Sequence, residues 1–215
     1  MELAGKKLFF LGDSITEGVG VSDAENIYWR ILARRTGAEC LGYGVSGTRI
    51  AKQLGENAEA SLDFNNRAEQ MGDDPDVVLV FGGTNDFGHG NVPLGNMTDD
   101  TEYTFYGAVK ALCCRLIRKY PQAQLVFMTP LHRALEEISM NEIGIRNVSN
   151  LAGYVAIIRE VAGYYGIPIL DLYTTSGFQP EFPELRQRYM PDGLHPNDAG
   201  HTIMAHKIEA FLRAL

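Results

Sequence analysis

Five residues, spread over four short segments, have the chemistry that acyl transfer requires: Ser14, Gly47, Asn85, Asp192 and His195. A serine hydroxyl is a weak nucleophile until a base removes its proton, and histidine is the side chain best suited to that task near neutral pH. A side-chain amide and a backbone N–H can stabilise the oxyanion that forms when the serine attacks a carbonyl. The residue types therefore predict a site for nucleophilic attack on an ester or a related acyl compound.

Ser14 stands in the segment GDSIT, directly after the apolar run LFFL. A serine on the tight turn after a buried strand projects into the rim of a sheet rather than into its core, where it can meet a substrate. An alternative interpretation is that Asp13 or Ser14 only caps the N-terminus of a helix. The segment on its own does not separate the two interpretations.

His195 stands in the segment DGLHP, before the last helical stretch. The carboxylate of Asp192, three residues earlier, can accept a hydrogen bond from the imidazole Nδ1–H and so fix its tautomer and orientation. Gly193 permits the tight turn that this contact needs, and Pro196 is suited to the first turn of the following helix. The alternative is an exposed loop histidine with no role.

Two further segments contribute candidate oxyanion donors. In GGTND, which follows the clearest apolar run, Asn85 offers a neutral amide; in GYGVSG, Gly47 offers its backbone N–H. The alternative for GGTND is an Asx-type turn that ends a strand. The glycines of GYGVSG also spell G-x-G-x-x-G with Asp63 about 20 residues further on, as in dinucleotide-binding proteins. That interpretation is disfavoured because the preceding strand is weak and second in the chain, and because residues 57–71 have a helical pattern.

Apolar runs alternate with helical stretches along the whole chain. Strands are predicted over residues 6–12, 38–44, 76–83, 123–130 and 167–173, and helices over 25–36, 57–71, 101–120, 149–165 and 197–215. This alternation predicts parallel βαβ units and a three-layer α/β sandwich. Because parallel sheets bind ligands at the carboxyl ends of their strands, the candidate segments should converge on one rim.

Length and charge narrow the class of protein further. The 215 residues are predicted to form one domain, residues 1–215, and the formal net charge of −8 argues against a nucleic-acid partner. No apolar run reaches the ~18 residues of a membrane span, and the N-terminus does not resemble a signal peptide. The three cysteines do not indicate a disulfide framework. These features predict a cytoplasmic protein.

Together, in their order, the blocks GDSIT, VSG, GGTND and DGLH resemble those of the SGNH hydrolases, the GDSL esterase/lipase superfamily, over residues 8–200. The resemblance implies that Ser14 is the nucleophile, His195 the general base and Asp192 its orienting carboxylate. It implies an oxyanion hole formed by the backbone N–H groups of Ser14 and Gly47 and the side chain of Asn85. It also implies a flavodoxin-like sheet of five parallel strands in the order 2-1-3-4-5, with no cofactor and no metal.

The substrate is less well defined than the reaction. We expect a small-molecule ester with a short acyl group, such as acetyl on a carbohydrate, because no long apolar lid segment stands out; a lysophospholipid or a thioester remains an alternative. Residues 131–150 and 174–191 are expected to be long rim loops that set specificity. His132 and Arg133 are candidates for a polar substrate group. Tyr173, Phe178 and Phe182 are candidates for an acyl pocket or for packing. His201 and His206 are expected to face solvent.

Two alternatives come from other functional classes. A metal-dependent phosphoesterase would use Asp13, Asn85, Asp86 and His195 as ligands, but no second aspartate follows two residues after Ser14 and no early D-x-H occurs. A non-catalytic binding module on the same fold is also compatible with the pattern. Such a module would be expected to have lost part of the constellation, whereas all five positions are intact.

Overall fold

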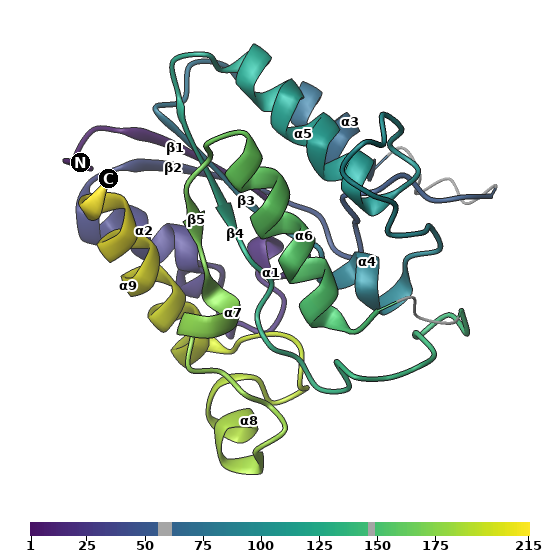
Figure 1. Ribbon diagram of the computed structural model, residues 1–215. Coiled ribbons are helices and arrows are strands. Elements are labelled where there is room, and N and C mark those ends of the chain that lie inside the picture. Colours follow the sequence, from purple (N-terminus) through teal and green to yellow (C-terminus); the bar gives the residue numbers. More distant parts are fainter. Residues whose placement is uncertain (56–61, 146–148) are drawn as a thin grey trace.

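The computed structural model describes residues 1–55, 62–145 and 149–215, and its centre is a parallel five-stranded sheet (Figure 1). The strands are Lys7–Gly12 (β1), Glu39–Gly44 (β2), Val77–Phe81 (β3), Gln124–Met128 (β4) and Ile169–Leu170 (β5). Their order is β2-β1-β3-β4-β5. The predicted fold class and strand order are therefore confirmed.

Helices cover both faces of this sheet (Figure 1). The longer ones are Tyr28–Thr36 (α2), Phe64–Gln70 (α3), Phe105–Lys119 (α5), Leu151–Tyr164 (α6) and Asp198–Ala214 (α9), and the shorter ones are Ser14–Glu17 (α1), Thr84–His89 (α4), Leu172–Thr175 (α7) and Pro183–Tyr189 (α8). A 3₁₀ turn spans Ala24–Asn26. Within the described residues, no helix combines the length and the apolar character that crossing a bilayer requires.

The two sides of the sheet bury separate cores. Alternate residues of β1 point to opposite sides: Phe9 and Leu11 pack with α3, α5 and α6, whereas Leu8 and Phe10 pack with α2 and α9. A strand buried on both faces has no polar alternation, which is why β1, β3 and β4 are continuous apolar runs in the sequence. The edge strand β2 is more exposed, and its pattern is correspondingly weaker.

Several predicted boundaries were wrong. The strand predicted over 167–173 pairs only at Ile169–Leu170, because Asp171 then caps α7. The helix predicted over 57–71 spans Phe64–Gln70 after the cap residue Asp63, and residues 56–61 lie outside the described part. The predicted loop 174–191 contains α8, which starts at Pro183. The short helices α1 and α4 were not predicted.

His201 is a further correction, because its side chain is fully buried rather than solvated. It lies on the same face of α9 as Met204, Ala205 and Ile208, at the spacing of an amphipathic helix. Its Nδ1 accepts a hydrogen bond of 3.1 Å from the backbone N–H of Tyr28, at the start of α2. The two rings are stacked, with their centroids 5.8 Å apart. His201 therefore joins α9 to the first turn of α2.

Candidate active site

Ser14, His195 and Asp192 form a continuous hydrogen-bonded series at the carboxyl end of β1. The Ser14 Oγ lies 2.9 Å from His195 Nε2, and His195 Nδ1 lies 2.6 Å from Asp192 Oδ2. Because a carboxylate only accepts hydrogen bonds, the proton of the neutral imidazole is on Nδ1, and the lone pair of Nε2 faces the serine hydroxyl. The arrangement can remove the serine proton as the oxygen attacks.

The turn after β1 places Ser14 with little freedom. Asp13 caps α1 by accepting the Ile15 N–H at 3.1 Å, and Ser14 is the first residue of that helix. The cap and the serine are therefore adjacent residues, so the two interpretations of the GDSIT segment do not exclude each other. Ser14 is largely buried, with only 6% of its surface exposed.

A tight turn closes the contact between Asp192 and His195. Gly193 adopts φ +84°, a left-handed conformation that side-chain-bearing residues rarely take. The second oxygen of Asp192 accepts the backbone N–H groups of Leu194 at 2.8 Å and His195 at 2.7 Å. Partial burial raises the pKa of Asp192, but these hydrogen bonds and that of the imidazole outweigh it and hold the pKa below its ordinary value. The orienting group is thus a carboxylate at neutral pH.

The candidate oxyanion donors come from the segments after β2 and β3. Gly47 adopts φ +74°, and a Cβ there would meet no atom within 4 Å, so its conformation rather than crowding favours glycine. The buried Asn85 donates from Nδ2 to the carbonyl of Thr48 at 3.0 Å. This hydrogen bond fixes the Asn85 amide against the loop that carries Gly47.

Arg67 of α3 is a buried cation that the sequence analysis did not identify. Its Nη1 donates to Thr48 Oγ1 at 2.7 Å, and its Nη2 donates to the carbonyls of Gly12, at 2.7 Å, and of Tyr43. One guanidinium thus joins the carboxyl ends of β1 and β2 to the loop of Gly47. Burial lowers the pKa of Arg67 to about 10, so it stays charged at neutral pH. The sequence did contain an indication of this role, because Arg67 lies among the apolar residues of the predicted helix 57–71.

Two buried carboxyl groups flank this centre. Burial raises the pKa of Asp13 to about 6, although the hydrogen bond from Ile15 lowers it. Burial also raises the pKa of Asp86 to about 6, and its two oxygens accept the N–H groups of Ile50 at 3.0 Å and Ala51 at 2.9 Å. Asp86 therefore holds the loop after β2, instead of pointing at Ser14 as a metal ligand would. Within the described residues, no three His, Cys, Asp or Glu side chains converge so as to hold a metal ion.

Gly44 of the GYGVSG segment has a packing role. A Cβ on Gly44 would lie 2.1 Å from the backbone N of Glu17, so glycine permits the close approach of β2 to α1. Asp63 is the N-cap of α3, where it accepts the Asn66 N–H at 2.9 Å. The acidic residue of the apparent dinucleotide pattern thus stabilises a helix terminus.

His132 and Arg133, at the carboxyl end of β4, differ in environment. His132 lines a pocket of about 230 Å³ together with Asp13, Ile15 and Leu194, the neighbours of Ser14 and His195. Its Nδ1 lies 2.9 Å from Glu136. Arg133 is buried and donates to the Thr84 carbonyl at 3.3 Å and to Glu142, so it supports the rim structurally.

The aromatic residues after β5 do not line this pocket. The ring of Tyr173 packs on that of His132 at a tilt of 33°, with a centroid separation of 3.8 Å. Phe178 is buried against Tyr189, and Phe182 is exposed. Tyr173 and Phe178 thus pack, as the packing alternative predicted, whereas Phe182 faces solvent.

The fold and the site geometry agree with the comparison with protein families. The sequence profile of the GDSL-like Lipase/Acylhydrolase family matches residues 10–203, so the chain belongs to that family. Its members are hydrolases that act on esters. No curated protein is significantly similar to the chain in sequence.

Solved structures show the same architecture. A protein from Lactobacillus plantarum is 31% identical, with a TM-score of 0.83 and alignment over 99% of this chain and 98% of that one. A protein from Bacteroides ovatus described as a GDSL-like lipase is 19% identical, with a TM-score of 0.67 over 99% of this chain and all of that one. A two-domain esterase active on acetylated mannans is 20% identical, with a TM-score of 0.60 over 99% of this chain and 49% of that one.

Proposed function

We propose that the protein is a serine esterase that releases short acyl groups through an acyl-enzyme on Ser14. The observation that carries this proposal is the Ser14–His195–Asp192 series, with contacts of 2.9 and 2.6 Å. It supplies a nucleophile, a base of defined tautomer and a carboxylate that stabilises the imidazolium formed during attack.

In the first half-reaction, His195 Nε2 takes the proton of Ser14 as its Oγ bonds to the ester carbonyl carbon. The N–H groups of Ser14 and Gly47 and the amide of Asn85 stabilise the oxyanion. The C–O bond to the alcohol then breaks, and His195 gives its proton to the departing oxygen. In the second half, water loses a proton to His195 and attacks the acyl carbon; the acid leaves, and Ser14 regains its proton.

The pocket beside Ser14 supports a short acyl group. Residues adjacent to Ser14 and His195 in the chain enclose a small space, about 230 Å³ including the part open to solvent, which offers little room for a long acyl chain. Phe81 and Leu131 line it with apolar atoms, which suits an acetyl methyl group better than a charged acid. The esterase active on acetylated mannans demonstrates only that this fold can accommodate such a substrate.

The first prediction concerns Ser14→Ala. The variant should lose at least ~10⁴-fold in kcat with p-nitrophenyl acetate, because triad members act as a unit. It should unfold in urea at nearly the wild-type midpoint. A fluorophosphonate should label the wild type at Ser14 and leave the variant unlabelled.

A series of p-nitrophenyl esters from acetate to decanoate tests the acyl preference. We expect kcat/KM to be highest for the shortest chains. Full activity of Ser14→Ala would disprove the serine mechanism, whereas a preference for long chains would disprove only the short-acyl assignment and favour a lysophospholipase. Higher kcat/KM with acyl thioesters would favour a thioesterase.

A further inference from the structure

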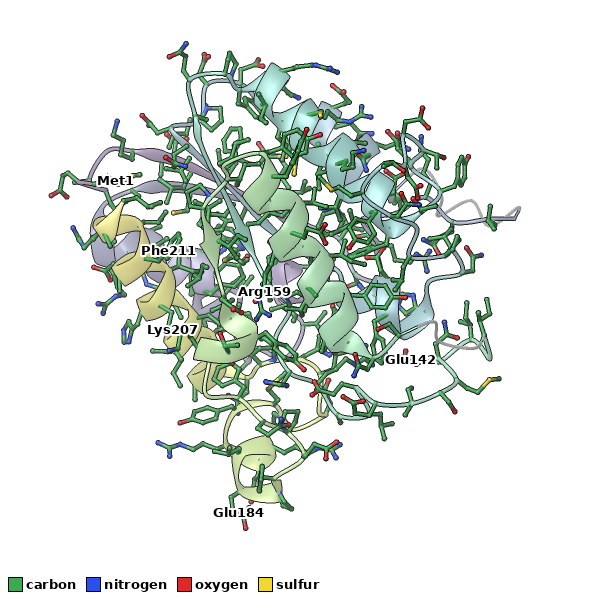
Figure 2. The ribbon with its side chains drawn as sticks, viewed as in Figure 1. Met1, Glu142, Arg159, Glu184, Lys207 and Phe211 are labelled. Atoms are coloured by element: carbon green, nitrogen blue, oxygen red, sulfur yellow. The ribbon has the colours of Figure 1, made fainter. Side chains whose placement is uncertain are left out.

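A polar groove is lined in part by Gly47. Its walls include Arg49, from the segment after β2, His89, at the end of α4, and Glu142, from the long segment after β4. Ser46 and Gly47 form its near end, so it begins at the proposed oxyanion hole. We call it the rim groove. Figure 2 shows Glu142 on the same side of the molecule as α4 (compare Figure 1).

Hydrogen bonds between the three segments hold the walls of the rim groove in place. Asn91 donates its N–H to Gln53 Oε1 at 2.7 Å and accepts the Leu54 N–H at 2.8 Å, which joins the first two segments. Glu142 donates its N–H to the Gly88 carbonyl at 2.8 Å, which joins the second to the third. A groove fixed in advance loses less entropy when a ligand binds, so these contacts are those expected of a binding site.

The chemistry of the walls suits a ligand with many hydroxyl groups. Arg49 supplies hydrogen-bond donors, and Glu142, whose carboxylate is paired with Arg133, supplies acceptor oxygens. Arg49 Nη1 lies 2.9 Å from His89 Nδ1; because arginine only donates, this histidine is neutral, with its proton on Nε2. A sugar hydroxyl both donates and accepts hydrogen bonds, so adjacent hydroxyl groups can accept from Arg49 and donate to Glu142.

One apolar side chain completes the rim groove. Ile143 lines the groove and is 55% exposed. Covering its apolar surface with a ligand would therefore contribute favourable free energy to binding. The C–H faces of a pyranose ring are apolar and can pack on such a side chain while the ring hydroxyl groups meet polar neighbours. A phosphate or carboxylate ligand has no comparable apolar face to pack on Ile143.

We infer that the rim groove binds the sugar of an acetylated carbohydrate, with Arg49 and Glu142 as its hydrogen-bonding partners, while Ser14 attacks the acetyl group. This inference rests on the proposed esterase function and assigns the alcohol side of its substrate. Arg49 and Glu142 determine specificity here and take no part in bond making.

The test compares kcat/KM for glucose pentaacetate with kcat/KM for p-nitrophenyl acetate in Arg49→Gln and Glu142→Gln. The two substrates share the acetyl group, but only the first contains a sugar ring. The ratio of the two values should fall about 10-fold or more in each variant, as expected for the loss of a charge-assisted hydrogen bond of about 1.5–3 kcal/mol. Arg118→Gln and Glu184→Gln are matched controls: Arg118 is exposed on α5, and Glu184 is on α8, far from Glu142 in Figure 2. Their ratios should equal that of the wild type.

The outcomes separate the groove from the esterase proposal. If p-nitrophenyl acetate is hydrolysed through Ser14 but the ratio is unchanged in both groove variants, the rim groove does not bind the sugar and the esterase proposal stands. A wild type that hydrolyses lysophosphatidylcholine better than glucose pentaacetate would overturn the carbohydrate assignment in the same way. If one variant fails to fold, the other tests the opposite wall.

Discussion

Asn85 uses one of the two N–H groups of its side-chain amide to bind the Thr48 carbonyl. Its other N–H has no hydrogen-bond partner among the described residues and is therefore able to meet a developing oxyanion. An amide whose orientation is fixed before the reaction does not have to reorient as the transition state forms, so it stabilises the oxyanion more effectively. The position of Asn85, after β3, thus depends on the loop of Gly47, which follows β2 on the other side of β1.

This arrangement leads to a prediction for Asn85→Ala. The variant should lose ~10²–10³-fold in kcat with p-nitrophenyl acetate, the usual effect of removing one oxyanion donor, while KM changes little. The matched control is Asn65→Ala, since Asn65 is also buried and donates from Nδ2 to the Ile50 and Ala108 carbonyls, away from Ser14. Both variants should unfold more easily in urea, but only Asn85→Ala should have reduced kcat. Equal kcat values for the two would contradict an oxyanion role.

At the level of single residues, the sequence identified the groups whose types are chemically unusual at a strand end, such as Ser14 and His195. It did not identify Arg67, because the partners of Arg67 are backbone carbonyls in distant segments, and a carbonyl has no residue type to recognise. Asp86 was noted as a potential metal ligand, but its contacts with two backbone N–H groups depend on how the loop after β2 folds back.

At the level of elements, Arg67 connects α3 to two strand ends and one loop. A buried cation that satisfies three acceptors is hard to replace, because its removal leaves those acceptors desolvated and unpaired. Since Gly12 lies two residues before Ser14 and Thr48 follows Gly47, the same side chain also holds the proposed nucleophile and the proposed oxyanion donor in place relative to each other. We therefore expect a change at Arg67 to affect both stability and activity.

Arg67→Met should lower the free energy of unfolding by about 3 kcal/mol or more, since each lost hydrogen bond to a charged group is worth about 1.5–3 kcal/mol. It should also reduce kcat for p-nitrophenyl acetate at least tenfold at a temperature where the variant is fully folded. Arg118→Met, at an exposed position of α5, should change stability by no more than about 0.5 kcal/mol. Urea unfolding and steady-state kinetics measure both effects. A variant with normal kcat would show that Arg67 is structural only.

The burial and the length of an element explain whether it could be predicted from the sequence. Strands β1, β3 and β4 are buried on both faces, so their apolar runs are easy to recognise. The end of β5 was predicted too late, because the apolar Leu172 of α7 extends the apolar run beyond the strand. Helices α1 and α4 contain only four and six residues. Such segments are too short to show a 3.6-residue period, and their glycines and aspartates suggested turns instead.

At the level of the whole molecule, the alternation of strands and helices specified the layers, and the family resemblance supplied the strand order. The contacts between layers were less predictable. His201 was expected in solvent because of its polar side chain, yet its position on α9 coincides with the apolar stripe. Burial against Tyr28 lowers the pKa of His201 to about 4, with Asp198 raising it and His195 lowering it further. Its Nε2 is buried and has no hydrogen-bond partner in the described part of the chain.

The buried His201 predicts a specific pH dependence of stability. Its pKa is about 4 in the folded protein and 6.5 in the unfolded chain, so between these values the unfolded chain binds more protons. The stability contributed by neutral His201 is therefore complete above about pH 6.5 and is lost at roughly 1.4 kcal/mol per pH unit as the pH falls towards 4. This loss should amount to about 3 kcal/mol in total.

His201→Asn removes the titration while keeping an oxygen that can accept the Tyr28 N–H in place of Nδ1. The free energy of unfolding of the wild type minus that of the variant should therefore decrease as the pH is lowered from 7 to 4.5 in urea titrations. Subtraction cancels the contributions of Asp13 and Asp86, whose raised pKa values favour the folded state at acid pH instead. His206→Asn is the matched control, since His206 is exposed on the same helix, and its difference from the wild type should not depend on pH. A difference for His201→Asn that stays constant over this range would show that the contact between α2 and α9 does not depend on a neutral imidazole.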